Sequence, residues 1–193
     1  MRSALFLGIG VICGIVLMAL PKALAHAHHA LHGGGEQSPA GQARLHTQEA
    51  FSFLANAPVE SVFPLLGAER ERAWAPHWNP QFVYPLPAAD REGMVFTVAH
   101  DHLQAAWVNT LFDAKNGRIQ YVCVIPDALV TVINLKLTPN GQKTKVDVQY
   151  ERTALSPDAD AHVKHMADGD RKAGPEWEQQ LSSYLAQQTA NGK

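Results

Sequence analysis

The sequence predicts an α+β domain in which a run of antiparallel strands is followed by a long C-terminal helix. Two patterns predict it. Between residues 81 and 153, short stretches rich in β-branched and aromatic residues alternate with turn-forming residues, as in an antiparallel meander. From Val163 onward, apolar residues recur at spacings of three and four, which is the period of an amphipathic helix.

One strand and two short helices are expected ahead of the meander. Residues 49–54 have the composition of a strand. Residues 56–63 then form a helix that Pro64 keeps short. A second helical piece over 68–74 ends before Pro76, because proline lacks the N–H that continues a helix.

The meander predicts six further strands, separated by clusters of glycine, asparagine, aspartate and proline. These strands are expected over residues 81–84, 94–100, 104–112, 118–125, 129–137 and 144–153. Alternation is cleanest in the last strand, where Val146, Val148 and Tyr150 share one face and charged or amide side chains share the other. We therefore expect one face of the sheet to be covered and the other to face solvent.

The C-terminal segment is expected to cover the sheet. Ser156 and Pro157 are typical of a helix start, and the apolar series that follows continues for about thirty residues. Asp170 is charged and therefore does not fit that apolar series. Gly174 and Pro175 interrupt it, so we expect either a kink or two helices that meet there.

The first 25 residues are predicted to be a secretory signal peptide. Arg2 supplies a positive charge, and residues 4–20 contain no charged or strongly polar side chain. The small-x-small pattern predicts cleavage after Ala25, with cleavage after Ala27 as the alternative. A retained anchor is the alternative to removal, because the apolar run approaches the roughly 20 residues that span a bilayer. We expect export to the periplasm, with no stable membrane span after cleavage.

Residues 26–43 are predicted to be a flexible linker rich in histidine and glycine, and residues 44–190 to form one domain. Loss of Arg2 and Lys22 with the signal peptide changes the formal net charge from −2 to −4. No basic patch remains, so nucleic acid is not an expected partner. Cys123 would be the only remaining thiol, and its apolar neighbours predict a buried, inert side chain.

The order of elements resembles the START-like superfamily, also called SRPBCC. Residues 57–63, Ala-Pro-Val-Glu-Ser-Val-Phe, resemble its A-P-x-E-x-V-F opening after the first strand, and residues 177–185 resemble its closing helix. Residues 74–80 resemble a tryptophan and proline segment of one bacterial branch. The resemblance covers residues 45–188. It implies a helix-grip fold, in which a curved antiparallel sheet of six to seven strands surrounds a long C-terminal helix, as in the birch pollen allergen and the polyketide cyclases.

The resemblance also implies a cavity between the sheet and the long helix that holds a hydrophobic or amphipathic small molecule or a lipid. The aromatic residues that could line such a cavity are Trp74, Trp78, Phe82, Tyr84, Phe96, Trp107, Tyr121, Tyr150 and Trp177. The alternative is that these side chains fill an ordinary core, as large aromatics commonly do. The cavity hypothesis predicts a binder or carrier.

Three residues are candidates for proton transfer in a cyclase-like or dehydratase-like enzyme. His100 shares a strand face with Phe96 by parity, although residues 100–102 also suit a solvent-exposed turn. His77 lies between two tryptophans, and Tyr150 carries a hydroxyl on the covered face. The G-x-S-x-G, H-E-x-x-H, phosphate-loop and paired-cysteine motifs are absent from the sequence, and we expect no cofactor in the domain.

The linker histidines are a separate candidate site. Cleavage after Ala25 would place His26 first and His28 third in the mature chain. A free amino terminus with histidine in third position can chelate Cu(II) or Ni(II) in a square plane. His29 and His32 lie nearby. A histidine-rich spacer without a metal is the alternative.

Overall fold

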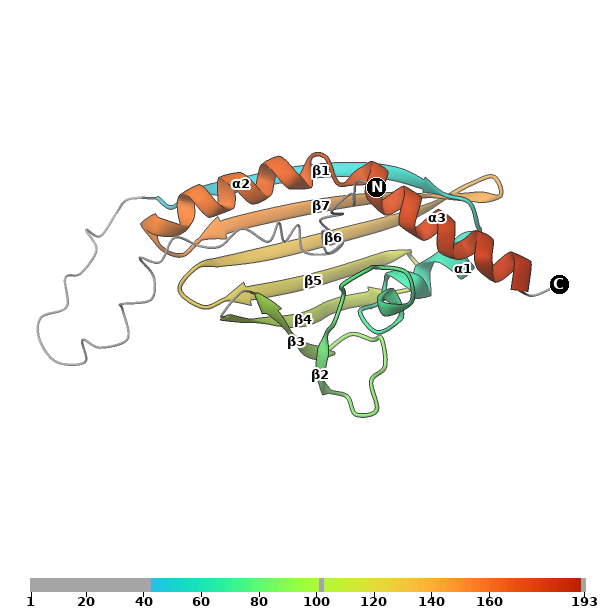
Figure 1. The fold of residues 1–193 in the computed structure, drawn as a ribbon, viewed down its shortest axis with the longest axis horizontal. Helices are drawn as coiled ribbons and strands as arrows, with labels where there is room; N and C mark the ends of the chain where they lie inside the picture. Colours follow the sequence, from blue (N-terminus) through green and yellow to red (C-terminus); the bar gives the residue numbers. More distant parts are fainter. Residues whose placement is uncertain (1–42, 101–102, 192–193) are drawn as a thin grey trace, which may run out of the picture.

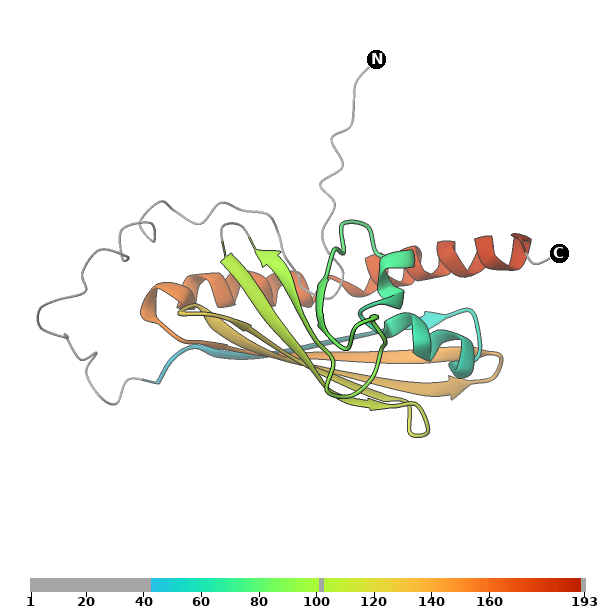
Figure 2. The ribbon, with the colours of Figure 1, turned by 90° about the horizontal axis from the view of Figure 1, so that it is seen from below.

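The structure is a computed structural model that describes residues 43–100 and 103–191. The predicted signal peptide and all but the last residue of the predicted linker lie outside these residues. The described part forms a seven-stranded antiparallel sheet, with strand order β1-β7-β6-β5-β4-β3-β2. Two long helices run along one face of this sheet (Figure 1, Figure 2). The predicted α+β helix-grip architecture is confirmed.

The elements follow the predicted order, and their bounds are as follows. Strand β1 (His46–Ala55) is followed by α1 (Val59–Val62) and the 3-10 helices η2 (Phe63–Leu66) and η3 (Arg70–Ala73). The meander consists of β2 (Gln81–Tyr84), β3 (Val95–His100), β4 (Leu103–Asp113), β5 (Arg118–Ile125), β6 (Leu129–Asn140) and β7 (Lys143–Ala154). The chain ends in η4 (Pro157–Ala159), α2 (Asp160–Asp170) and α3 (Gly174–Asn191).

The strands are predicted well in their centres and less well at their ends. β2 and β5 have the expected bounds, whereas β1 begins at His46 instead of residue 49. β1 pairs with β7 along its whole length, from His46 opposite Thr153 to Ala55 opposite Thr144. Backbone pairing with β7, which needs no apolar side chain, therefore extends β1 beyond its hydrophobic pattern.

The two faces of the sheet differ as predicted. In β7, Val146, Val148 and Tyr150 are buried, whereas Lys145 on the other face is exposed. The same alternation runs through β5 and β6, so one continuous face packs beneath the helices. Cys123 is buried on this inner face, as predicted.

The C-terminal segment forms two helices instead of one kinked helix, and they meet at residues 171–173 beside the predicted interruption. Gly174 is buried at the start of α3, where a Cβ would lie 3.3 Å from the Phe51 ring of β1. The absence of a side chain at Gly174 therefore lets the first turn of α3 lie close against the sheet. In the described part of the chain, none of the helices combines the length and apolar character needed to cross a bilayer.

A buried ion pair fastens α2 to the sheet. Arg152 donates from Nε and Nη2 to the two Asp170 carboxylate oxygens at 2.7 and 2.8 Å, and from Nη1 to Thr131 Oγ1 at 2.9 Å. The side chains of Arg152 and Asp170 are only 0% and 2% exposed. The bidentate geometry satisfies both charges without water. It explains why Asp170 interrupts the apolar series of the helix.

Candidate ligand-binding site

All of the predicted aromatic residues except Tyr84 form two groups between the inner face of the sheet and the segments that cover it. The first group lies beneath α3, where the ring centroid of Trp177 is 5.5 Å from Phe51, 6.0 Å from Phe53 and 6.0 Å from Trp74. Tyr150 joins it, 6.3 Å from Phe51. Most of these contacts are edge-on or tilted, which is a favourable geometry for aromatic rings.

The second group surrounds Phe96, which is stacked 5.6 Å from Trp107 and lies 5.8 Å from Trp78 and 6.3 Å from Tyr121. Phe82 contacts it from β2 and is half-buried. The buried members of the predicted set are Trp74, Trp78, Phe96, Trp107, Tyr121, Tyr150 and Trp177. In this structure they pack directly against one another.

Tyr84 does not join either group. It has the same parity as Phe82, but the register of β2 against β3 shifts between these two residues, with Phe82 opposite Phe96 and Tyr84 opposite Val95. A bulge of this kind re-aims the side chain that follows it. Tyr84 is therefore 54% exposed.

The second group ends at a buried polar cluster. The Tyr121 hydroxyl donates to the Leu66 carbonyl at 3.1 Å, and its cross-strand neighbour is the fully buried Asn109. Complete burial raises the pKa of the Tyr121 phenol well above its usual range, and the negative charges of Asp90 and Glu71 raise it further. Tyr121 is therefore a neutral hydroxyl that can donate a hydrogen bond.

Two open grooves flank the C-terminal half of α3. The first, which we call the α1 groove, has a volume of about 880 Å³. Its lining residues come from the β1–α1 segment, α3 and the β6–β7 turn: Asn56, Ala57, Pro58, Ser61, Leu65, Gln142, Ser182, Tyr184, Leu185, Ala186, Gln188 and Thr189. The second, the η3 groove, has a volume of about 400 Å³ and is lined by residues 72–76 and by Gln179, Gln180, Ser183, Tyr184 and Gln187 of α3. Tyr184 lines both grooves, and Trp74 of the first aromatic group lines the η3 groove.

Two polar atoms on the buried side of α3 lack a hydrogen-bond partner among the described residues. One is the indole N–H of Trp177, whose side chain is 1% exposed, and the other is Oε1 of Gln180. Gln180 uses its other amide atom, Nε2, to donate to Glu176 at 2.9 Å. A buried donor or acceptor without a partner is unfavourable, so both atoms are available to a molecule bound beneath the helix.

The three candidate proton-transfer residues occupy separate environments. His100 ends β3 on the inner face, 3% exposed, and its ring centroid lies 5.6 Å from that of His162 in α2. These two histidines border a small cavity of about 20 Å³, which has room for one water molecule. His77 is exposed in the loop before β2, where its φ angle is 67°. Tyr150 lies in the middle of β7 beneath the first aromatic group.

The predicted metal ligands His26, His28, His29 and His32 lie outside the described residues. Among the residues that are described, no three histidine, cysteine or acidic side chains are grouped so that they could hold a metal ion.

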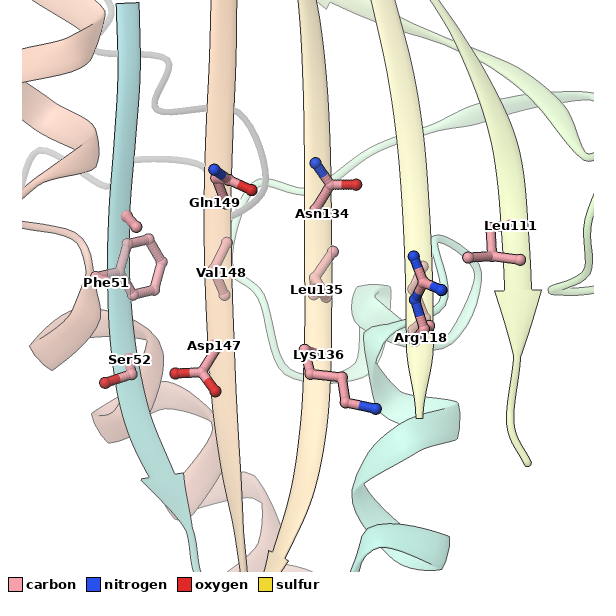
Figure 3. Close-up of a pocket in the computed structure, with 12 residues that line it drawn as sticks. Phe51, Ser52, Leu111, Arg118, Asn134, Leu135, Lys136, Asp147, Val148 and Gln149 are labelled. Carbon is pink, nitrogen blue, oxygen red and sulfur yellow. The ribbon is translucent and has the colours of Figure 1, made fainter. Parts of the chain in front are cut away.

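A third groove, of about 770 Å³, lies on the outer face of the sheet (Figure 3). Arg118 and Lys136 are directly opposite each other on β5 and β6, and Lys136 is opposite Asp147 on β7. Gln120 Nε2 donates to Asn134 Oδ1 at 2.7 Å across the neighbouring row. None of the predicted aromatic residues contributes to this groove, which is the polar, solvated face that the strand alternation predicts.

Of the residues that line the α1 and η3 grooves, only Trp74 is a predicted site residue. Phe51 and Phe53 could have been recognised as site residues, because two large aromatic residues two positions apart share one face of a strand. The serines and glutamines of α3 could not have been recognised in the sequence, since they resemble the solvated face of any amphipathic helix. Only the position of α3 over α1 and η3 makes them groove residues.

No protein-family model and no curated protein matches the chain. Solved structures do. A norcoclaurine synthase mutant from Thalictrum flavum is 10% identical over 77% of this chain and 99% of that chain, with a TM-score of 0.58. Mll3558 from Rhizobium loti is 14% identical over 74% of this chain and 99% of its own, with a TM-score of 0.52. Ara h 8.0201 is also 14% identical over 74% and 99%, with a TM-score of 0.50. The chain has the helix-grip fold of the START-like, or SRPBCC, superfamily.

Proposed function

We propose that the protein is an exported carrier of a hydrophobic or amphipathic small molecule, which binds beneath the C-terminal half of α3. The observation that carries this proposal is the pair of unpartnered atoms, Trp177 Nε1 and Gln180 Oε1, between the aromatic group and the η3 groove. A cargo with an apolar body and a hydroxyl would satisfy both atoms while it covers the aromatic rings, because a hydroxyl can accept from Trp177 Nε1 and donate to Gln180 Oε1.

Access to this position requires α3 to move, because the aromatic rings pack directly against it. The helix is suited to such movement. Only Gly174, Trp177 and Leu181 of α3 are buried, and residues 186–191 are exposed. The segment that separates the two grooves is therefore held by few buried side chains, which is typical of elements that open locally.

The lining of the grooves favours binding over catalysis. Both grooves are lined by aliphatic, aromatic, amide and hydroxyl side chains, together with Arg72, and neither lining includes histidine or an acidic residue. General acid–base catalysis most often uses histidine or a carboxylate, and the only titratable side chains in these two linings are Tyr184 and Arg72. The norcoclaurine synthase structure was solved with a transition state analogue, which supports a small-molecule site in a protein of this fold.

The test is binding of the apolar dye 1-anilinonaphthalene-8-sulfonate or a fluorescent fatty acid to the exported chain. We expect about one site per chain and a higher melting temperature with the ligand, because a molecule that binds the folded state stabilises it. Ala73 and Ser183 are exposed and line the η3 groove from η3 and from α3. Ala73→Trp and Ser183→Trp fill that groove without replacing a core residue, and each is expected to weaken binding about tenfold or more.

The matched control is Ser52→Trp, which places the same bulky side chain in the groove on the outer face of the sheet. This variant should bind the dye like the unmodified protein. If Ser52→Trp weakens binding as much as Ser183→Trp, the dye does not bind beneath α3. If the unmodified protein neither binds the dye nor changes its melting temperature, the carrier function is wrong.

Export rests on the sequence alone and has its own test. Amino-terminal sequencing of the protein purified from the periplasm is expected to begin at His26 or His28, after one of the two small-x-small sites. A chain that still begins at Met1 and fractionates with membranes would show that the apolar segment is an anchor.

A further inference from the structure

We propose that the loop between β2 and β3 docks the protein on a lipid surface that carries anionic headgroups. The relevant segment comprises residues 83–89, which we call the apolar loop. It contains no charged side chain, and the Tyr84 hydroxyl is its only polar side-chain group. This inference depends on the loop alone and not on the cargo beneath α3.

The apolar loop carries the three most exposed large hydrophobic side chains in the described part of the chain. They are Val83, Tyr84 and Leu86, which are 56%, 54% and 73% exposed. In Figure 1 the loop projects at the bottom of the view, on the side opposite α2. Single exposed apolar side chains are common, but several within four residues mark an interaction site.

Contacts at both ends of the apolar loop keep it exposed to solvent. The bulge in β2 turns Tyr84 away from the inner face. At the other end of the loop, Asp90 accepts hydrogen bonds from the Glu69 and Arg70 backbone N–H groups at 2.8 and 3.1 Å. Burial raises the pKa of Asp90, and these hydrogen bonds act in the opposite direction. The carboxylate that follows the loop is therefore turned toward η3, and the loop is anchored there.

A positive charge lies two residues beyond the apolar loop, at Arg91, beside the exposed Glu92. Arg91 donates from Nη2 to the Tyr84 hydroxyl at 2.8 Å, and its guanidinium carbon lies 5.1 Å from the centroid of the Tyr84 ring. Tyrosine is enriched at membrane interfaces, where its ring is apolar and its hydroxyl is wet. Arginine at such a position attracts anionic lipid headgroups. Together with Val83 and Leu86, this pair has the composition of an interfacial anchor.

Pairing with a second copy of the chain through the free edge of β2 is less compatible with the loop. β2 has only four residues, and it lies at the edge of the sheet. Pro85 and Pro87 follow it and have no N–H to donate to a neighbouring strand. Short edges and prolines are features that prevent strand addition.

The experiment uses the mature chain with vesicles of phosphatidylcholine, with and without phosphatidylglycerol. Leu86→Trp places a fluorophore on the apolar loop. The native tryptophans are buried: Trp74, Trp78, Trp107 and Trp177. The fluorescence difference between the variant and the unmodified protein therefore reports the environment of the loop. We expect a blue shift with vesicles that contain phosphatidylglycerol, and quenching by brominated lipid tails. The matched control is Leu155→Trp, at a position that is 46% exposed where β7 passes into α2.

A blue shift in Leu86→Trp and not in Leu155→Trp supports docking through the loop. Equal shifts in both variants, or a shift in neither, overturn it. The double variant Val83→Asp/Leu86→Asp should keep its melting temperature but lose vesicle co-sedimentation by about tenfold or more, since two apolar anchors are removed. If the protein binds equally well to vesicles without phosphatidylglycerol, the attraction of anionic headgroups by Arg91 is overturned. Dye binding without vesicles is measured separately, so failure of docking and failure of the carrier function are distinguishable.

Discussion

Replacing Asp170 with alanine is expected to lower the free energy of unfolding by about 3–5 kcal/mol. The change leaves the Arg152 guanidinium buried, with 0% side-chain exposure and without the carboxylate that it binds through two hydrogen bonds. For a domain of this size, such a loss lowers the melting temperature by about 6–20 °C. Thermal or urea denaturation followed by circular dichroism measures the effect.

The control for this prediction replaces both partners with apolar residues of similar size, as in Arg152→Met/Asp170→Leu. This double variant removes the buried charge together with its partner, so its stability should lie close to that of the unmodified protein or above it. The prediction is contradicted if Asp170→Ala costs less than about 1 kcal/mol, which is the range of an exposed ion pair.

Replacing Trp177 with alanine is the second change with a large expected effect, a loss of about 3–5 kcal/mol in the free energy of unfolding. Trp177 is 1% exposed and contacts Phe51, Phe53 and Trp74 beneath α3. Its removal takes away most of the contact between α3 and the first aromatic group. A cavity lined by aromatic rings remains, and apolar cavities of this kind stay dry and bind small aromatic molecules.

Added indole should therefore occupy the cavity and raise the melting temperature of Trp177→Ala by more than it raises that of the unmodified protein. Leu181→Ala serves as the control, because Leu181 is also fully buried on α3 but leaves a smaller space. If indole stabilises Leu181→Ala equally, its effect does not report the Trp177 cavity. If Trp177→Ala is as stable as the unmodified protein, α3 is not held by this residue.

The candidate site could be predicted from the sequence only in part. Large aromatic residues on strands are recognisable, and Trp74, Phe96, Trp107 and Trp177 are buried on the inner face or beneath α3. Tyr84 could not be placed in this way, because a shift of register within β2 turns it outward. Strand parity predicts a face only while the register is regular. The same shift produced the exposed loop that we assign to membrane docking.

Local sequence patterns were enough to predict the class of fold, the order of the elements, the covered and solvated faces of the sheet, and an interruption of the C-terminal helical segment beside Gly174. These features follow from local properties: side-chain periodicity, turn residues and the backbone of proline and glycine. The tertiary structure alone decided that Asp170 pairs with Arg152, that His100 lies beside His162, and that grooves flank α3. Each of these depends on which residues of different elements meet, and periodicity within one element does not carry that information.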